Sequence, residues 1–179
     1  YLPKNSNPFD EDGIITGWQA IVESAEDGAF EIAVLPGRGT LIVHGGQDEY
    51  VLREMTSRQI DLDRPGGRRY YAHAFVPLDL PEAGETQDLT IQLEPGRKVS
   101  GRLVDEAGEP IERALMVTRL KISPAHLSWQ GFEREVIGGR FELASLPADD
   151  AVPCSFLEPE RMLGATAMVS GDEPEPTIT

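Results

Sequence analysis

The sequence predicts an all-β protein made of two small antiparallel β-sandwich modules in tandem, with little or no helix. The chain reads as short alternating or apolar runs separated by turn residues, among them 18 glycines and 14 prolines in 179 residues. No stretch of helical length keeps its apolar residues at the i, i+3, i+4 and i+7 positions without one of these breakers. A nine-residue phrase also occurs twice, which indicates two copies of one supersecondary unit.

The repeated phrase covers residues 28–36 and 139–147, and both copies read Gly-x-Phe-Glu-aliphatic-Ala-x-Leu-Pro. In each copy the glycine supplies a turn, alternate apolar side chains point into a core, and the proline ends the strand. Because the flanking pattern is the same, we expect Phe30 and Phe141 to occupy equivalent buried positions in two superposable hairpins. These residue types serve packing and turns, so the phrase predicts structure rather than catalysis.

The strand pattern recurs at regular spacing along the whole chain, which favours an antiparallel sandwich over a parallel sheet. The turn at Asp27-Gly28 and the turn at Gly138-Gly139 carry the residue pairs typical of tight hairpins. Strands are predicted over residues 14–23, 29–35, 40–44, 50–54, 69–76, 88–93, 98–105, 114–122, 132–136, 140–146, 152–157 and 165–169.

The domain boundary is predicted at the turn formed by residues 93–96. Residues 1–13 are then a linker or edge segment, residues 14–94 a first sandwich module that is divergent or truncated at its N-terminus, and residues 95–179 a second module. Modules of about 85 to 95 residues can bury a modest core. The residues expected in the core of the second module include Leu103, Val117, Phe141 and Leu143.

Charge and composition exclude several function classes. The chain has 31 acidic and 16 basic residues, a formal net charge of -15, which argues against nucleic-acid binding because phosphate contacts need a basic face. No window approaches the roughly 20 apolar residues of a membrane span, so no direct membrane insertion is expected. The single cysteine, Cys154, excludes an internal disulfide and a thiolate zinc site, and its apolar surroundings predict a buried, inert thiol.

A longer motif lies in the second module. Residues 99–114 read Val-x-Gly-x-Leu-x-Asp-x-x-Gly-x-Pro-Ile-x-x-Ala, and they are followed by Gly-Gly-x-Phe-x-Leu at 138–143 and Leu-Pro at 146–147. This pattern resembles the carboxypeptidase regulatory-like domain, a transthyretin-like, Ig-like small β-sandwich that recurs in bacterial envelope proteins. The resemblance is clear over residues 95–179 and partial over 14–95. It implies an accessory module in a secreted, periplasmic or cell-envelope protein.

The expected function is that of a non-catalytic spacer or scaffold in a larger protein, in contact with its other domains or with another protein. The chain has no Gly-x-Ser-x-Gly and no Gly-x4-Gly-Lys-Ser/Thr motif, so neither an enzyme nor a cofactor is expected. The alternative is a carbohydrate- or protein-binding module that uses the insertion at 121–131. Trp129 there either stacks on a ligand, with His126 and Tyr70 as further recognition residues, or closes the end of the sandwich.

Metal sites receive weak support from the sequence. None of the acidic turns matches the calcium loop Asp-x-Asp-x-Asp-Gly, and acidic turn residues ordinarily serve the turn itself, although a structural calcium ion stays an alternative. The histidines show no His-x-His spacing that would favour zinc. The turns concerned are at residues 10–13, 26–28, 61–63 and 149–150.

A self-made crosslink of the adhesin type is a further alternative. Lys98 lies on the opening strand of the second module, where such a bond would begin. The only asparagines, Asn5 and Asn7, precede this module, so a Lys–Asn isopeptide within it is excluded by composition. Asp172 is the remaining candidate acceptor.

Overall fold

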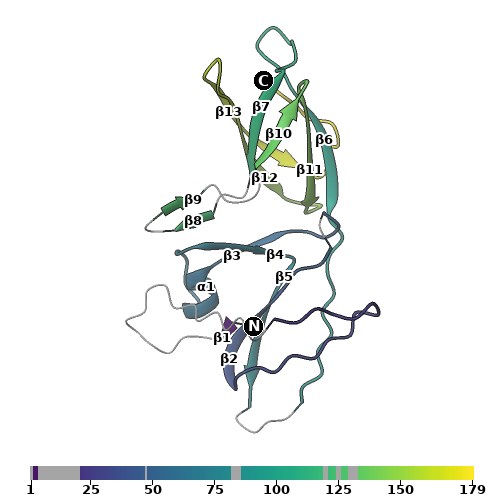
Figure 1. Cartoon of the computed structure of the whole chain (residues 1–179), viewed down its shortest axis with the longest axis vertical. Helices are drawn as coiled ribbons and strands as arrows, with labels where there is room; N and C mark the ends of the chain where they lie inside the picture. Colours follow the sequence, from purple (N-terminus) through teal and green to yellow (C-terminus); the bar gives the residue numbers. More distant parts are fainter. Residues whose placement is uncertain are drawn as a thin grey trace. The chain divides into compact units, whose positions relative to one another are not determined.

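The computed structural model describes residues 2–3, 21–46, 48–81, 86–118, 121–123, 126–128 and 133–179. Strands dominate them, and the only helix among the described residues, α1, has six residues, so the all-β prediction is confirmed (Figure 1). The elements are β1 Leu2–Pro3, β2 Gly37–Val43, β3 Arg53–Thr56, α1 Ser57–Leu62, β4 Arg69–Ala72, β5 Ala74–Leu80, β6 Arg97–Leu103, β7 Arg113–Thr118, β8 Lys121–Ser123, β9 His126–Ser128, β10 Glu133–Ile137, β11 Arg140–Leu146, β12 Ala151–Glu158, β13 Leu163–Ser170 and β14 Thr177–Ile178.

The chain divides into two compact units. The first comprises residues 1–44 and 54–92, and the second comprises residues 45–53 and 93–179. The sequence placed 45–53 in the first module, whereas here the segment belongs to the second unit. A bulge in β11 interrupts its ladder with β6, and the Ser145 carbonyl at this bulge accepts a hydrogen bond from Leu52 N at 3.0 Å.

The second unit is a β-sandwich folded from strands in the order β13-β12-β7-β10-β11-β6-β14. Adjacent strands are antiparallel except for β14, which pairs parallel to β6. A single residue pair, Ile137 with Arg140, joins β10 to β11 beside their tight turn. The chain therefore turns a corner there, and β13-β12-β7-β10 and β11-β6-β14 form two layers over one core.

The core of the second unit contains most of the residues expected there. Phe141, Leu143 and Leu103 are buried, as predicted. The Phe141 ring lies 5.0 Å from the ring of Phe156, and it also covers Gly101 on the neighbouring strand. A Cβ atom on residue 101 would lie 2.1 Å from Phe141 Cζ, so only glycine leaves room for the aromatic ring.

The prediction that Val117 is buried is wrong. Val117 is half-buried and pairs with Ser155, while its neighbour Met116 is 1% exposed and points into the core. Residues 114–117 are all apolar, so alternation alone does not tell which set faces inward. The pairing of β7 with β12 and β10 decides which of its side chains face the core.

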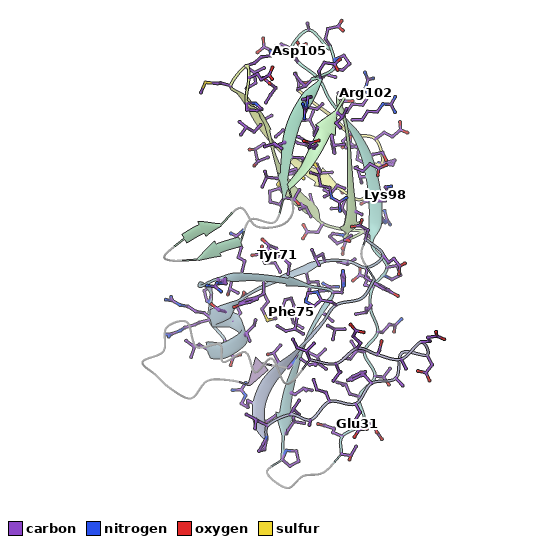
Figure 2. All side chains as sticks on the ribbon, in the orientation of Figure 1. Glu31, Tyr71, Phe75, Lys98, Arg102 and Asp105 are labelled. Carbon is purple, nitrogen blue, oxygen red and sulfur yellow. The ribbon has the colours of Figure 1, made fainter. Side chains whose placement is uncertain are left out.

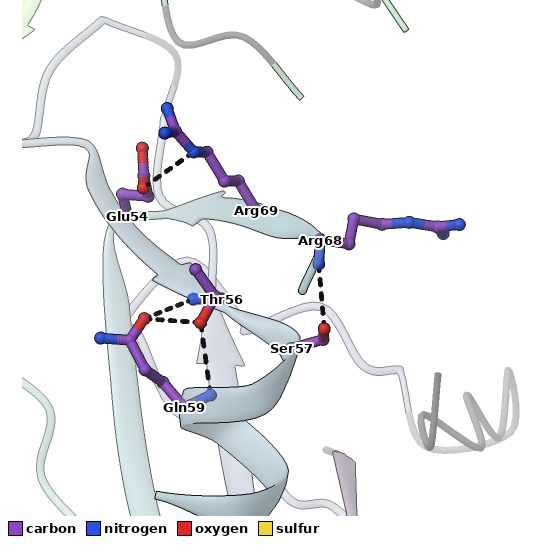
Figure 3. Close-up of polar contacts among 6 residues, drawn as sticks. All are labelled: Glu54, Thr56, Ser57, Gln59, Arg68 and Arg69. Carbon is purple, nitrogen blue, oxygen red and sulfur yellow. Dashed lines mark hydrogen bonds and ion pairs between the residues drawn. The ribbon is translucent and has the colours of Figure 1, made fainter. Parts of the chain in front are cut away.

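The first unit contains the sheet β1-β2-β5, the ribbon β3-β4 and the helix α1. Thr56 caps the helix: its hydroxyl accepts from Gln59 N, while the Gln59 side chain accepts from Thr56 N at 2.8 Å (Figure 3). Ser57 Oγ also accepts from Arg68 N at 3.0 Å, which ties the helix to β4. This helix was not predicted, although Thr56 and Gln59 form a capping-box pattern in the sequence.

The first copy of the repeated phrase does not form the expected strand. Residues 29–36 pair with no other strand in the described part of the chain, and the same holds for the predicted strand at 88–93. Phe30 is 38% exposed, whereas Phe141 is 3% exposed. The expectation that these two residues occupy equivalent core positions is therefore wrong, because the first copy lacks the neighbouring strands that surround the second.

Candidate functional site

Two turns of the second unit meet at one end of its sandwich. One turn joins β6 to β7 and contains Asp105, and the other joins β12 to β13 and contains Arg161. The Arg161 guanidinium Nη2 lies 3.6 Å from Asp105 Oδ2 and so links the two turns. Figure 2 shows Asp105 in the loop at this end of the unit.

The first turn is organised by the Asp105 carboxylate. Its Oδ1 accepts hydrogen bonds from Ala107 N at 3.0 Å and from Glu109 N at 3.1 Å, and Gly108 supplies the positive φ of 83° that the turn needs. The hydrogen bond from the Glu109 amide, reinforced by the Ala107 amide and Arg161, holds the pKa of Asp105 below its usual range. This carboxylate is therefore charged at neutral pH.

The second turn is organised by Glu158, a buried acidic residue. Its carboxylate accepts from Glu160 N at 3.0 Å and from Arg161 N at 2.6 Å, which replaces the water that burial removes. Met162 then adopts a left-handed φ of 51° and is 87% exposed. The turn thus presents Arg161 and Met162 on the surface of the unit.

Two hollows flank the Glu158–Arg161 turn. The first has a volume of about 540 Å³ and the second about 480 Å³, and both are in the size range that accepts a small ligand or a few side chains. Ile111 lines both hollows, and Phe156 and Leu163 add apolar surface to the first. The hollows therefore combine an apolar lining with a charged rim.

The charge around the hollows is strongly negative. Six carboxylates line one hollow or both, against two guanidinium groups. The carboxylates belong to Asp105, Glu106, Glu112, Glu135, Glu158 and Glu160, and the guanidinium groups to Arg113 and Arg161. We call residues 104–112 and 158–164 the acidic loop end. Carboxylates at the rim of apolar hollows suit the binding of a cation that carries an apolar group.

The acidic loop end could not be predicted from the sequence patterns. Residues 105–110 belong to the motif at 99–114, but nothing in the sequence places Arg161 beside them. The buried Glu158 carries the only local signal, an acidic residue at the end of an apolar run. The pairing of β12 with β7 and β13 supplies the rest.

The recognition residues proposed from the sequence are distributed differently. Tyr70 lies half-buried in β4 of the first unit, and His126 lies in β9 of the second. Trp129 lies outside the described residues, so its two interpretations stay predictions. Beside Tyr70, burial and then the charge of Glu54 raise the pKa of Tyr71 to about 12.

Of the calcium candidates, Asp150 accepts a hydrogen bond from Ala151 N at 2.8 Å, and Asp63 is the C-cap residue of α1. Asp27 Oδ1 accepts from Ala29 N at 3.0 Å, and the turn at residues 10–13 lies outside the described residues. In the first unit the rings of His44 and His73 approach edge to face with centroids 6.2 Å apart. No group of three or more His, Cys, Asp or Glu side chains among the described residues is placed to hold a metal ion.

The remaining sequence candidates have structural roles. Cys154 is fully buried, as predicted. Lys98 forms an exposed ion pair with Glu142 at 2.8 Å, while Asp172 pairs with Arg97 at 2.5 Å, so Lys98 and Asp172 are not partners and the crosslink finds no support. In the described part of the chain, no helix is long and apolar enough to cross a membrane.

Comparison of the chain with protein-family models, with curated proteins and with solved structures gave no match. The likeness to carboxypeptidase regulatory-like domains therefore rests on the motif at residues 99–147 alone.

Proposed function

We propose that the chain is a non-catalytic interaction module of a larger secreted or envelope protein, and that its acidic loop end binds a basic segment of a protein partner. The observation that carries this proposal is the excess of carboxylates around two apolar hollows. The resemblance to an accessory sandwich domain supports the setting, and a spacer role for the packed sandwich is compatible with it.

The chemistry of the hollows favours lysine and arginine side chains as ligands. Their aliphatic stems can pack on exposed apolar surface such as Leu163, which is 41% exposed, while their charged heads stay at a wet rim. An anionic ligand would have to approach Arg161 through Asp105, Glu106 and Glu158, which repel it. The net charge of the chain also steers basic partners toward it.

The test is a calorimetric titration of the full chain with an unstructured peptide that consists of lysine, leucine and glycine. A peptide with glutamate in place of lysine is the control ligand. We expect binding of the basic peptide only, and weaker binding at high salt because exposed charge pairs are screened.

Two double variants distinguish binding at the acidic loop end from a general effect of the net charge. Glu106 and Glu160 are exposed and line the hollows, and the double variant Glu106→Lys, Glu160→Lys should weaken binding about tenfold, the effect of two exposed charge pairs. The double variant Glu26→Lys, Glu31→Lys changes the net charge equally in the first unit and should bind as the wild type does. Equal weakening by both pairs, or no binding of the basic peptide, would contradict the proposal.

A further inference from the structure

The strand β13 is the outer strand of its sheet and has an unusual edge. It spans eight residues, Leu163–Ser170, with the sequence LGATAMVS, which contains no charge and no proline in a chain of net charge -15. No hydrogen bond joins its outer edge to another described strand. Natural sheets usually protect such edges with lysine, proline, a bulge or a covering segment.

The other end of the same sheet is protected in this way. There the short strand β14 covers part of β6, and the Pro174 and Pro176 carbonyls accept from the backbone of β6. The strand β6 itself carries Arg97, Lys98 and Arg102. The two ends of the sheet therefore differ: one is charged and covered, and the other is neutral and open.

Apolar side chains stand on the outer face beside the open edge. Met168 pairs with Pro153 and is 62% exposed, and Leu157 pairs with Gly164 and is 48% exposed. Thr166 faces the same side, where its hydroxyl lies 3.3 Å from that of Ser155. An added strand would cover part of this apolar surface and would satisfy the backbone groups of the edge.

We propose that β13 pairs antiparallel with β13 of a second copy of the chain, so that the sheet continues across a two-fold axis. A two-fold contact requires a surface that complements itself, and a neutral strand meets that requirement without like-charge repulsion. Along β13 two copies of this acidic chain therefore avoid the like-charge repulsion that they meet over most of their surfaces. This interface shares Leu163 and Gly164 with the acidic loop end, but it does not depend on the function proposed for that end.

One register places the uncharged residues of the two strands directly opposite one another. In an antiparallel pair, directly opposite residues share a face of the sheet. With Ala167 on the axis, Met168 faces Thr166 of the second copy, and residues 164–170 of the two copies lie opposite one another.

The experiment measures the mass of the full chain in solution by sedimentation equilibrium over a range of concentrations. We expect an equilibrium between the chain of 19.6 kDa and a species of twice that mass. The variant Met168→Lys should shift this equilibrium to the monomer, because it brings two like charges to the seam. The control is Ile137→Lys, which makes the same charge change at a residue that is also 62% exposed, beside the β10–β11 turn.

Circular dichroism verifies that both variants keep the strand content of the wild type. A second variant on the same face, Thr166→Lys, should also give the monomer. A wild-type chain that stays monomeric at every concentration would overturn the proposal and leave the edge to an extended segment of another protein. A dimer that persists in Met168→Lys and Thr166→Lys, or that is lost equally in Ile137→Lys, would overturn it too.

Discussion

The nine-residue phrase occurs at residues 28–36 and again at 139–147, but its two copies have different structures. The second copy spans the strand β11 and buries Phe141 to 3% exposure, whereas the first forms no strand and leaves Phe30 38% exposed. The residues within the phrase are therefore not sufficient for a strand. Strand propensity depends on packing against neighbours, and here the neighbours differ.

The two phenylalanines have different neighbours. Phe141 lies against Gly101 of β6 and the ring of Phe156 of β12. Phe30 instead lines an open hollow of about 730 Å³ together with Leu41 and Leu78. The same side chain thus closes a core in one unit and borders a cavity in the other.

The largest expected effect is on the stability of the second unit. Phe141→Ala should lower its free energy of unfolding by roughly 3 to 5 kcal/mol, because a buried aromatic ring is replaced by a cavity. Phe30→Ala removes a side chain that is already partly in water and should cost less than about 1 kcal/mol. Urea unfolding followed by circular dichroism measures both. Equal losses would show that the two copies are equivalent after all.

A smaller effect is expected from the residue opposite Phe141. Gly101→Ala places a methyl group within 2.1 Å of the phenyl ring and should cost about 1 to 3 kcal/mol through overpacking. The matched control is Gly164→Ala in β13, where the new Cβ meets only a carbonyl oxygen at 3.6 Å. The same unfolding measurement applies, and a Gly101→Ala variant as stable as Gly164→Ala would mean that Phe141 does not pack on Gly101.

The smallest expected effect is on the pH dependence of stability in the first unit. Tyr71 of β4 lies there in a packed region that also contains β3 and α1. Because the pKa of Tyr71 is raised to about 12, the folded chain keeps this phenol protonated where the unfolded chain ionises near 10. Its contribution to stability is therefore complete below pH 10 and is lost as pH rises from about 10 to 12.

Titration of tyrosinate absorbance tests this expectation. One of the four tyrosines should ionise last, and Tyr71→Phe should remove that step. Glu54→Gln should lower the pKa of Tyr71, because the Glu54 charge disfavours the phenolate, and Glu31→Gln should leave it unchanged. If all four tyrosines ionised near pH 10, the result would show that Tyr71 is not buried beside Glu54.

The sequence predicted the second unit better than the first for a physical reason. From residue 97 onward, alternation and turn residues agree with the tertiary pairing, so β6, β11 and β12 lie close to their predicted bounds. In the first unit the same signals failed at residues 29–35 and 88–93, where no described strand offers a ladder partner. The acidic loop end was missed because Asp105 and Arg161 meet only through the pairing of strands far apart in the chain.

Amide hydrogen exchange of the full chain, with and without the basic peptide, tests the central claim most directly: the complete sandwich of the second unit carries the binding site. Without peptide, we expect residues 139–147 to be protected and residues 28–36 to exchange fast, because only the former are in a strand ladder. Peptide should add protection at the acidic loop end and leave 28–36 unchanged. Equal protection of both copies, or protection gained in 28–36 instead of the acidic loop end, would contradict the account.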